Sequence, residues 1–151
     1  NIFSMIAHLG LGLLLISISF NSLLSTERAL NIKINEFEEY KDLRINFKDI
    51  RVVKNTNHDS IKAIFLIEDN SGKVFELSPE KRRYFTRGQI TTETSIYISA
   101  LRDIYITIGD QLDDGSWVVN VQINYLIRWI WFSASLMAFA GIVLIFSRRN
   151  N

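Results

Sequence analysis

The sequence predicts a membrane protein of the α+β class, with two transmembrane helices flanking a small all-β domain of barrel or sandwich type. Two apolar runs predict the helices: residues 2–24 contain no Asp, Glu, Lys or Arg, and a second run covers residues 126–146. About 20 apolar residues at 1.5 Å each match a hydrocarbon core of about 30 Å. Between the runs, apolar and polar residues alternate over short stretches, which predicts strands. The predicted parts are a helix at 2–24, a β-domain at 25–124, a helix at 125–147 and a tail at 148–151.

Composition excludes several classes of function. The 151 residues have a formal net charge of +1 and include no Cys. So small a net charge gives no basic field for binding nucleic acid. Without Cys there are no disulfides, thiolate metal sites or Cys nucleophile. The chain begins with Asn rather than Met, so we expect a fragment or a processed product.

The first apolar run is predicted to span the membrane. A signal peptide is the alternative, because the run ends in small residues, but the run lacks a basic n-region and exceeds the usual apolar length of about 7–15 residues. Its small and polar side chains fall near one face on helical spacing. They are Ser4, His8, Gly12 and Ser19. Such a stripe favours contact with another helix in lipid.

His8 is the one titratable side chain of this run and the main candidate site residue. It lies roughly 10 Å along the helix at 1.5 Å per residue. We expect it to face other protein or a ligand rather than lipid. One interpretation is a histidine hydrogen-bonded to a neighbouring helix. The other is a functional group, because ionisable residues in membranes are costly and imidazole is a usual axial ligand of haem iron.

Seven or eight strands are predicted between the two helices, because residues 50–53 continue residues 43–47 after a short break. They cover residues 29–34, 43–47, 50–53, 61–67, 74–77, 91–98, 103–108 and 116–123. Asp69-Asn70-Ser71-Gly72 predicts a hairpin turn, and residues 78–84 predict a charged connection. No stretch has a convincing helical period. Short strands with regularly spaced turns favour a small barrel or a sandwich.

Few residues of the middle region suggest chemistry. His58 lies in a polar loop and is expected to be solvated rather than a ligand. Asp110, Asp113 and Asp114 lack the later Glu of an EF-hand loop, so a plain turn is predicted. Lys81-Arg82-Arg83 could hold an anion such as a propionate or a phosphate, although we favour a solvated surface. On residues alone, this domain is a binding or scaffolding module.

The second run begins like a membrane boundary. Tyr125, Trp129 and Trp131 form an aromatic belt, and Arg128 can reach lipid headgroups. Three small residues predict a packing stripe on this helix. They are Ala134, Ala138 and Gly141.

Two basic residues follow the second run and set the expected topology. Arg148 and Arg149 favour the cytoplasmic side for the C-terminus. With two spans, the N-terminus is then also inside and the middle domain is outside. His8 is therefore expected in the cytoplasmic half of the first helix.

Several stretches, taken in order, are similar to a known family. They are Ala7-His8-Leu9-Gly10, Phe20, Ser25-Thr26-Glu27, Leu77 to Tyr84, Thr92-Glu93, Leu101 to Tyr105, Ile108-Gly109-Asp110 and Arg128 to Trp131. In this order and spacing they resemble the C-terminal part of the CcmF family of cytochrome c-type biogenesis proteins, which are haem lyases. The resemblance covers essentially the whole chain.

This resemblance implies a function in cytochrome c maturation. The family consists of large, multi-pass proteins of the bacterial inner membrane or its organellar equivalent, with the middle domain of this chain in the periplasm. Its members receive haem from the chaperone CcmE and attach it to the CXXCH thiols of apocytochrome c, together with CcmH and CcmI-type partners. They also hold a haem b in the membrane, and the His of the A-H-x-G stretch is one axial ligand. By this resemblance His8 is that ligand, and the second axial ligand lies outside this chain.

The chain also departs from the family pattern. The tryptophan-rich haem-handling segment and the periplasmic histidines are absent, and the usual Pro is not evident near Tyr125-Leu126. This chain alone is therefore not expected to be catalytic. An alternative function is non-enzymatic: a membrane-anchored β-domain that docks apocytochrome or biogenesis partners, with His8 as a packing residue. A third interpretation is an anchored outer domain unrelated to the family.

Overall fold

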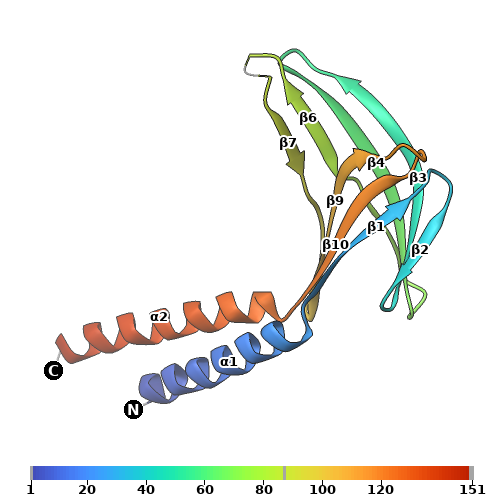
Figure 1. Ribbon diagram of the computed structural model, residues 1–151. Helices are drawn as coiled ribbons and strands as arrows, with labels where there is room; N and C mark the ends of the chain where they lie inside the picture. Colours follow the sequence, from blue (N-terminus) through green and yellow to red (C-terminus); the bar gives the residue numbers. More distant parts are fainter. Residues whose placement is uncertain (1, 87, 150–151) are drawn as a thin grey trace. The chain divides into compact units, whose positions relative to one another are not determined.

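The structure is a computed structural model that describes residues 2–86 and 88–149. The chain forms two compact units. The helix-pair unit contains the residues up to Thr26, the connection Ile98–Asp103 and the residues from Ile123 onwards, whereas the β-unit contains Glu27–Tyr97 and Ile104–Gln122. Two apolar helices and an all-β middle region are present, which confirms the predicted fold class (Figure 1).

The helix-pair unit contains helices α1 (Ile2–Leu24) and α2 (Ile127–Arg149), which run side by side in opposite directions (Figure 1). Both are long and apolar enough to cross a membrane. Small residues form their contact, since Gly10 and Ser17 of α1 and Ser133 and Ala140 of α2 are buried. A Cβ atom at Gly10 would lie 2.7 Å from Cγ of Met137. Glycine therefore permits the close approach of the two helices.

The contact faces differ from those predicted. The predicted stripe residues are exposed on both helices, apart from Ser4 and Ala134, which are half-buried. The exposed ones are His8, Gly12, Ser19, Ala138 and Gly141. At 100° per residue, Gly10 and Ser17 define a second small-residue face of α1. α2 packs on that face, where Met137 fits into the gap at Gly10.

Backbone contacts fix where α2 begins. Leu126 adopts a left-handed conformation with φ of 54°, and its N–H donates to the Leu101 carbonyl at 2.9 Å. The Tyr125 N–H donates to the Ser25 hydroxyl at 3.1 Å, and the Tyr125 carbonyl accepts from the Asn21 amide at 2.7 Å. These bonds tie the end of α1 to the start of α2.

The strands of the described chain form two sheets (Figure 1). One has the order β1-β10-β9-β8, and the other has the order β2-β3-β4-β6-β7, with β5 also paired to β4. The strands are β1 (Thr26–Ile32), β2 (Phe37–Tyr40), β3 (Leu43–Lys54), β4 (His58–Asp69), β5 (Val74–Leu77), β6 (Glu80–Tyr84), β7 (Ile90–Glu93), β8 (Ser95–Ile98), β9 (Arg102–Gln111) and β10 (Trp117–Tyr125).

Alternating apolar residues build the core of the β-unit, as a half-buried antiparallel sheet requires. Phe47 and Phe65 are register partners on β3 and β4, have no exposed surface, and stack with ring centroids 4.5 Å apart. The alternating residues of β9 and β10 within this unit are also fully buried. They are Ile104, Ile106, Ile108, Val119 and Val121.

The strands depart from the prediction at several places, and strand β2 was not predicted at all. Residues 43–53 form one strand, β3, with an irregularity between Phe47 and Asp49 rather than a break. The charged connection at 78–84 contains strand β6, and residues 91–98 are divided at Thr94 into strands of different sheets. The predicted hairpin turn is confirmed, because Gly72 has φ of 79° and Asp69 accepts hydrogen bonds from two following N–H groups. The tail predicted at 148–151 is helical to Arg149 and then lies outside the described residues.

Candidate functional site

The structure places His8 on the exposed face of α1, away from α2. Gly10, which packs on Met137, is two residues further and therefore about 200° around the helix. The His8 Nδ1 atom lies 2.6 Å from the Ser4 carbonyl oxygen, one turn earlier. That oxygen can only accept, so Nδ1 carries the proton and donates. The Nε2 atom is left as a lone-pair donor, with no hydrogen-bond partner among the residues that the structure describes.

This arrangement fits a single axial ligand of haem iron. A metal-binding imidazole normally donates its other ring N–H to a fixed acceptor, which sets both the tautomer and the ring orientation. The surroundings of His8 form an apolar hollow along α1, lined by Ile2, Ser4, Met5, Ile6 and Leu9. An apolar, exposed helix face is suited to a planar apolar macrocycle, and His8 would supply its axial nitrogen.

The other histidine, His58, has both ring nitrogens engaged. Its Nδ1 lies 2.6 Å from the Asn57 amide oxygen, and its Nε2 lies 3.0 Å from the Asn55 amide nitrogen. Its ring also lies at 5.2 Å from the Tyr84 ring. The structure thus places His58 at the first residue of β4, paired with Tyr84 of β6 and half-buried, rather than in the predicted solvated loop. The part of the chain that the structure describes contains no cluster of three or more His, Cys, Asp or Glu side chains suited to a metal ion.

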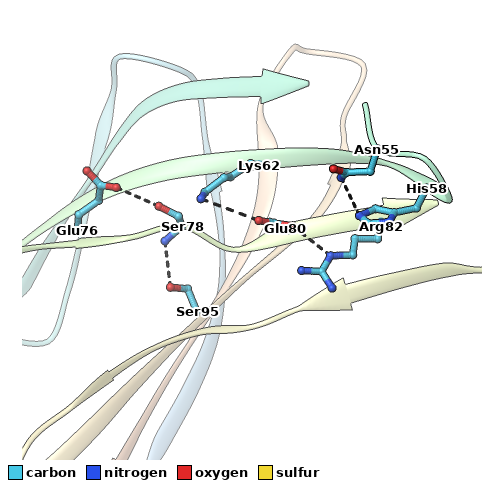
Figure 2. Close-up of polar contacts among 8 residues, drawn as sticks. All are labelled: Asn55, His58, Lys62, Glu76, Ser78, Glu80, Arg82 and Ser95. Atoms are coloured by element: carbon cyan, nitrogen blue, oxygen red, sulfur yellow. Dashed lines mark hydrogen bonds and ion pairs between the residues drawn. The ribbon is translucent and has the colours of Figure 1, made fainter. Parts of the chain in front are cut away.

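The basic run Lys81-Arg82-Arg83 is divided between the two faces of β6. Arg82 pairs with Glu80 at 3.1 Å, and Lys62 lies 3.9 Å from Glu80 (Figure 2). Arg82 also lies 3.6 Å from Glu93 of β7. Hydrogen bonds to Tyr84 and to Glu80 raise the pKa of Arg82 further above its usual value. The network holds β4, β6 and β7 together on this face, so Arg82 is a structural cation.

Lys81 and Arg83 point away from that network. Lys81 forms an ion pair with Asp110 of β9. Arg83 is exposed, and within residues 2–86 and 88–149 it makes no ion pair. The sequence prediction therefore treated the three cations as one group, whereas the strand places Arg82 on one face and Lys81 and Arg83 on the other.

Asp113 and Asp114 lie in the turn after β9, as predicted, whereas Asp110 lies within the strand. The Asp114 carboxylate accepts from the Ser116 hydroxyl at 2.6 Å and from the Ser116 N–H at 3.0 Å. These hydrogen bonds from Ser116 lower the pKa of Asp114 below its ordinary value. Asp110 is engaged by Lys81. Asp110 and Asp114 thus have local structural roles.

A buried carboxylate that the sequence analysis missed lies in the helix-pair unit. Asp103, whose side chain is 6% exposed, pairs with Arg128 at 3.3 Å and accepts from the Ser99 N–H at 3.2 Å. Nearby, the Trp129 indole donates to the Ala100 carbonyl at 2.8 Å. Arg128 and Trp129, predicted as membrane-boundary residues, therefore also hold the connection Ile98–Asp103. The sequence gives no signal of this beyond an Asp at the start of a buried strand.

Comparison with known proteins identifies the family. The family model described as "CcmF C-terminal beta-sandwich" matches residues 23–124. The chain belongs to the CcmF family. The CcmF proteins of Escherichia coli strain K12 and of Pseudomonas fluorescens are each 31% identical to it over 144 residues. The Haemophilus influenzae CcmF is 30% identical over 145 residues. All three carry the name cytochrome c-type biogenesis protein CcmF.

The similarity covers nearly all of this chain but a small part of the relatives. It spans 95% of the chain and 22% of the Escherichia coli CcmF. The solved structure named "Cytochrome c Heme Lyase CcmF" matches with a TM-score of 0.73 at 13% identity, over 93% of this chain and 24% of that one. At this identity the structural match shows the fold: two helices and the β-domain between them. The chain thus corresponds to about a fifth of its curated relatives' length.

Proposed function

We propose that this chain is the C-terminal part of a haem lyase of cytochrome c maturation, in which His8 is an axial ligand of a haem b held in the membrane. The observation that carries the proposal is the state of the His8 imidazole in a chain of the CcmF family. Its Nδ1–H is committed to the Ser4 carbonyl, and its Nε2 faces an apolar surface that α2 does not cover.

The residues of this chain would position the iron ligand rather than attach haem. The Ser4 carbonyl holds the imidazole in one tautomer, and the packing of Gly10 on Met137 holds that face of α1 outward. When bound, haem b supplies a one-electron redox centre beside the haem in transit. The second axial ligand comes from outside this chain.

The proposed setting is the bacterial inner membrane or its organellar equivalent. α1 and α2 span the bilayer with both termini in the cytoplasm, and the β-domain lies in the periplasm. Length and hydropathy of the helices support the spans, and the basic residues after the second span support the orientation. In this setting the complete protein takes haem from CcmE and works with CcmH and CcmI-type partners on apocytochrome c.

The test is a reduced-minus-oxidised absorption spectrum of the complete, purified lyase assembly. We expect His8→Gly to remove the b-type signal and added imidazole to restore it. The matched control is Ile16→Gly, at a position that is 53% exposed and lies outside the hollow around His8. Ile and His have similar helix propensities, so both changes weaken the helix to a similar extent. A b-type signal that persists unchanged in His8→Gly would show that His8 is not the ligand.

The alternative, a docking module with His8 as a packing residue, predicts the opposite pattern. Deletion of residues 32–123 would abolish the capture of apocytochrome or partner proteins while bound haem stayed unchanged, and His8→Gly would leave the b-type spectrum intact. The two functions use different units of the chain, so both can hold.

A further inference from the structure

The β-unit contains an open cleft of about 380 Å³ that the haem-ligand proposal leaves without a function. Strands of both sheets line it. The lining residues are Val52, Asp59, Ser60, Ile61, Lys81, Arg82, Arg83, Ile90, Asp110, Gln111 and Trp117. Most of the lining surface is apolar, although it includes three cations and two carboxylates. Its volume lies in the range of ligand-binding clefts, about 300–1,000 Å³.

Two apolar side chains of this cleft are more than half exposed. Ile90 on β7 is 57% exposed, and Val52 on β3 is 67% exposed. Ile90 is the register partner of Arg83, so an apolar side chain and a cation without an ion pair lie side by side at the cleft. Asp59 is the register partner of Arg83 on its other side. The structure records no ion pair between Asp59 and Arg83, so the guanidinium can pair with an incoming carboxylate.

Unused hydrogen-bonding groups lie at the same cleft. The indole Nε1–H of Trp117 is buried and has no partner among the described residues. A buried donor without a partner is costly and needs an explanation. The lining strand β7 is the last strand of its sheet, so one of its backbone edges is unpaired within the described chain. The Trp117 indole needs an acceptor, and the free edge of β7 needs both donors and acceptors. A polypeptide backbone in extended conformation provides both.

The edge of β7 also lacks the usual protection against pairing. Exposed edges are normally blunted by charged residues or Pro. The opposite edge strand, β2, follows that rule with Glu38 and Glu39. Strand β7 has the sequence Ile-Thr-Thr-Glu, and its one charged residue, Glu93, is held by Arg82. β-branched residues on an unpaired edge suit the addition of another strand.

We propose that this cleft binds an extended segment of a partner polypeptide, which adds as a strand to the edge of β7 and places a carboxylate on Arg83 beside apolar side chains on Ile90. Backbone groups of the segment would pair with β7, and one of its carbonyls would accept from the Trp117 indole. The site is independent of haem ligation by His8, so either proposal can fail alone.

The test uses the full chain in phosphatidylcholine nanodiscs and dye-labelled synthetic peptides of about eight residues, long enough for a strand. Side chains two residues apart share one face of a strand, so the Val–Glu peptide repeats Val-Thr-Glu-Thr and the Val–Lys peptide repeats Val-Thr-Lys-Thr. The Pro peptide repeats the first with Pro in place of Thr to remove backbone donors. Fluorescence anisotropy gives the affinities. We expect the Val–Glu peptide to bind about tenfold or more tightly than either of the others, since both a charge pair and strand pairing are needed.

Variants locate the binding within the cleft. Ile90→Asp should weaken binding of the Val–Glu peptide about tenfold or more, and Arg83→Glu should reverse the preference towards the Val–Lys peptide. Trp117→Phe retains a ring but removes the donor, and should weaken binding several-fold. The matched control is Val74→Asp, because Val74 is also 57% exposed and lies outside the cleft.

Three results would overturn the proposal. The first is equal binding of the Glu and Lys peptides, and the second is an equal loss of binding in Val74→Asp and Ile90→Asp. The third is undiminished binding of the Pro peptide, which would indicate an anion site without strand pairing; displacement of the bound Val–Glu peptide by inorganic phosphate would indicate the same. The charge-reversed Arg83→Glu keeps the test decisive if Ile90→Asp fails to fold, since the Arg83 side chain is exposed.

Discussion

One added methyl group at Gly10 should weaken the helix pair, whereas the same addition at Gly12 should not. A Cβ at Gly10 would lie 2.7 Å from Cγ of Met137 and 3.3 Å from the carbonyl oxygen of Ser133. Carbon atoms prefer separations of about 3.5–4.0 Å, so roughly 1 Å of movement is required. A Cβ at Gly12 meets nothing within 4 Å. The two positions therefore differ in packing while they share a helix.

The magnitude follows from comparing the two variants. Overpacking a close contact costs about 1–3 kcal/mol. Replacing Gly by Ala within a helix stabilises the helix by about 1 kcal/mol, and this gain is the same at both positions. The difference between the variants therefore isolates the contact with α2. We expect Gly10→Ala to be less stable than Gly12→Ala by about 1–3 kcal/mol.

The assay exploits the absence of Cys from the chain. Single cysteines at Met5 and Ile145, which are 70% and 68% exposed, carry a donor and an acceptor dye without entering the helix contact. Titration of the detergent-solubilised protein with SDS separates the helices, and the midpoint of lost energy transfer reports their stability. Equal midpoints for the two variants, or a higher midpoint for Gly10→Ala, would refute the assignment of Gly10 to the contact.

Two further predictions concern the β-unit. Phe65→Ala, which removes a fully buried ring stacked on Phe47, should lower the free energy of unfolding by about 3–5 kcal/mol. Phe37→Ala, which removes a half-exposed ring under the Arg44 guanidinium, should cost at most about 1 kcal/mol. Urea denaturation of the full chain in detergent would measure both free energies of unfolding. Similar losses of stability in the two variants would contradict the predicted core. Hydrogen bonds from Ser116 lower the pKa of Asp114 in the folded chain, so their stabilisation is present above the unfolded pKa of about 3.9 and disappears as pH falls through the lower folded value. Ser116→Ala should therefore destabilise the chain more at about pH 6 than at about pH 2, and a pH-independent difference in urea midpoint would exclude this coupling.

Local sequence pattern was enough to predict the helices and the core strands. Helix α1 has the predicted bounds, because a run without charges leaves no other boundary. Ile104, Ile106 and Ile108 were assigned correctly to one buried face, since strict alternation over one strand has a single interpretation. The family resemblance was confirmed independently by the family model.

The remaining errors have a common cause, which is that the deciding partner is distant in sequence. Strand β6 consists of Glu-Lys-Arg-Arg-Tyr and has no apolar alternation, yet it pairs with β4 on one side and β7 on the other. Backbone pairing fixes such a strand, and its side chains alternate between the face with the Arg82 ion pairs and the face with Lys81 and Arg83. The cleft was equally hidden, because Trp117 and Ile90 are in different sheets and only the fold brings them to one lining.

The face of α1 that was predicted to contact another helix is the face that α2 leaves exposed. This helix has two small-residue faces, and α2 uses the one with Gly10 and Ser17. The face with His8, Gly12 and Ser19 is left exposed. In lipid, where apolar surface alone drives no helix association, small and polar side chains gain their stabilisation from close contact with another helix or a ligand. We therefore expect the second face to be covered in the complete protein. The haem-ligand proposal requires the same thing, since a hexacoordinate b-type haem on His8 needs a second ligand from an element that approaches this face.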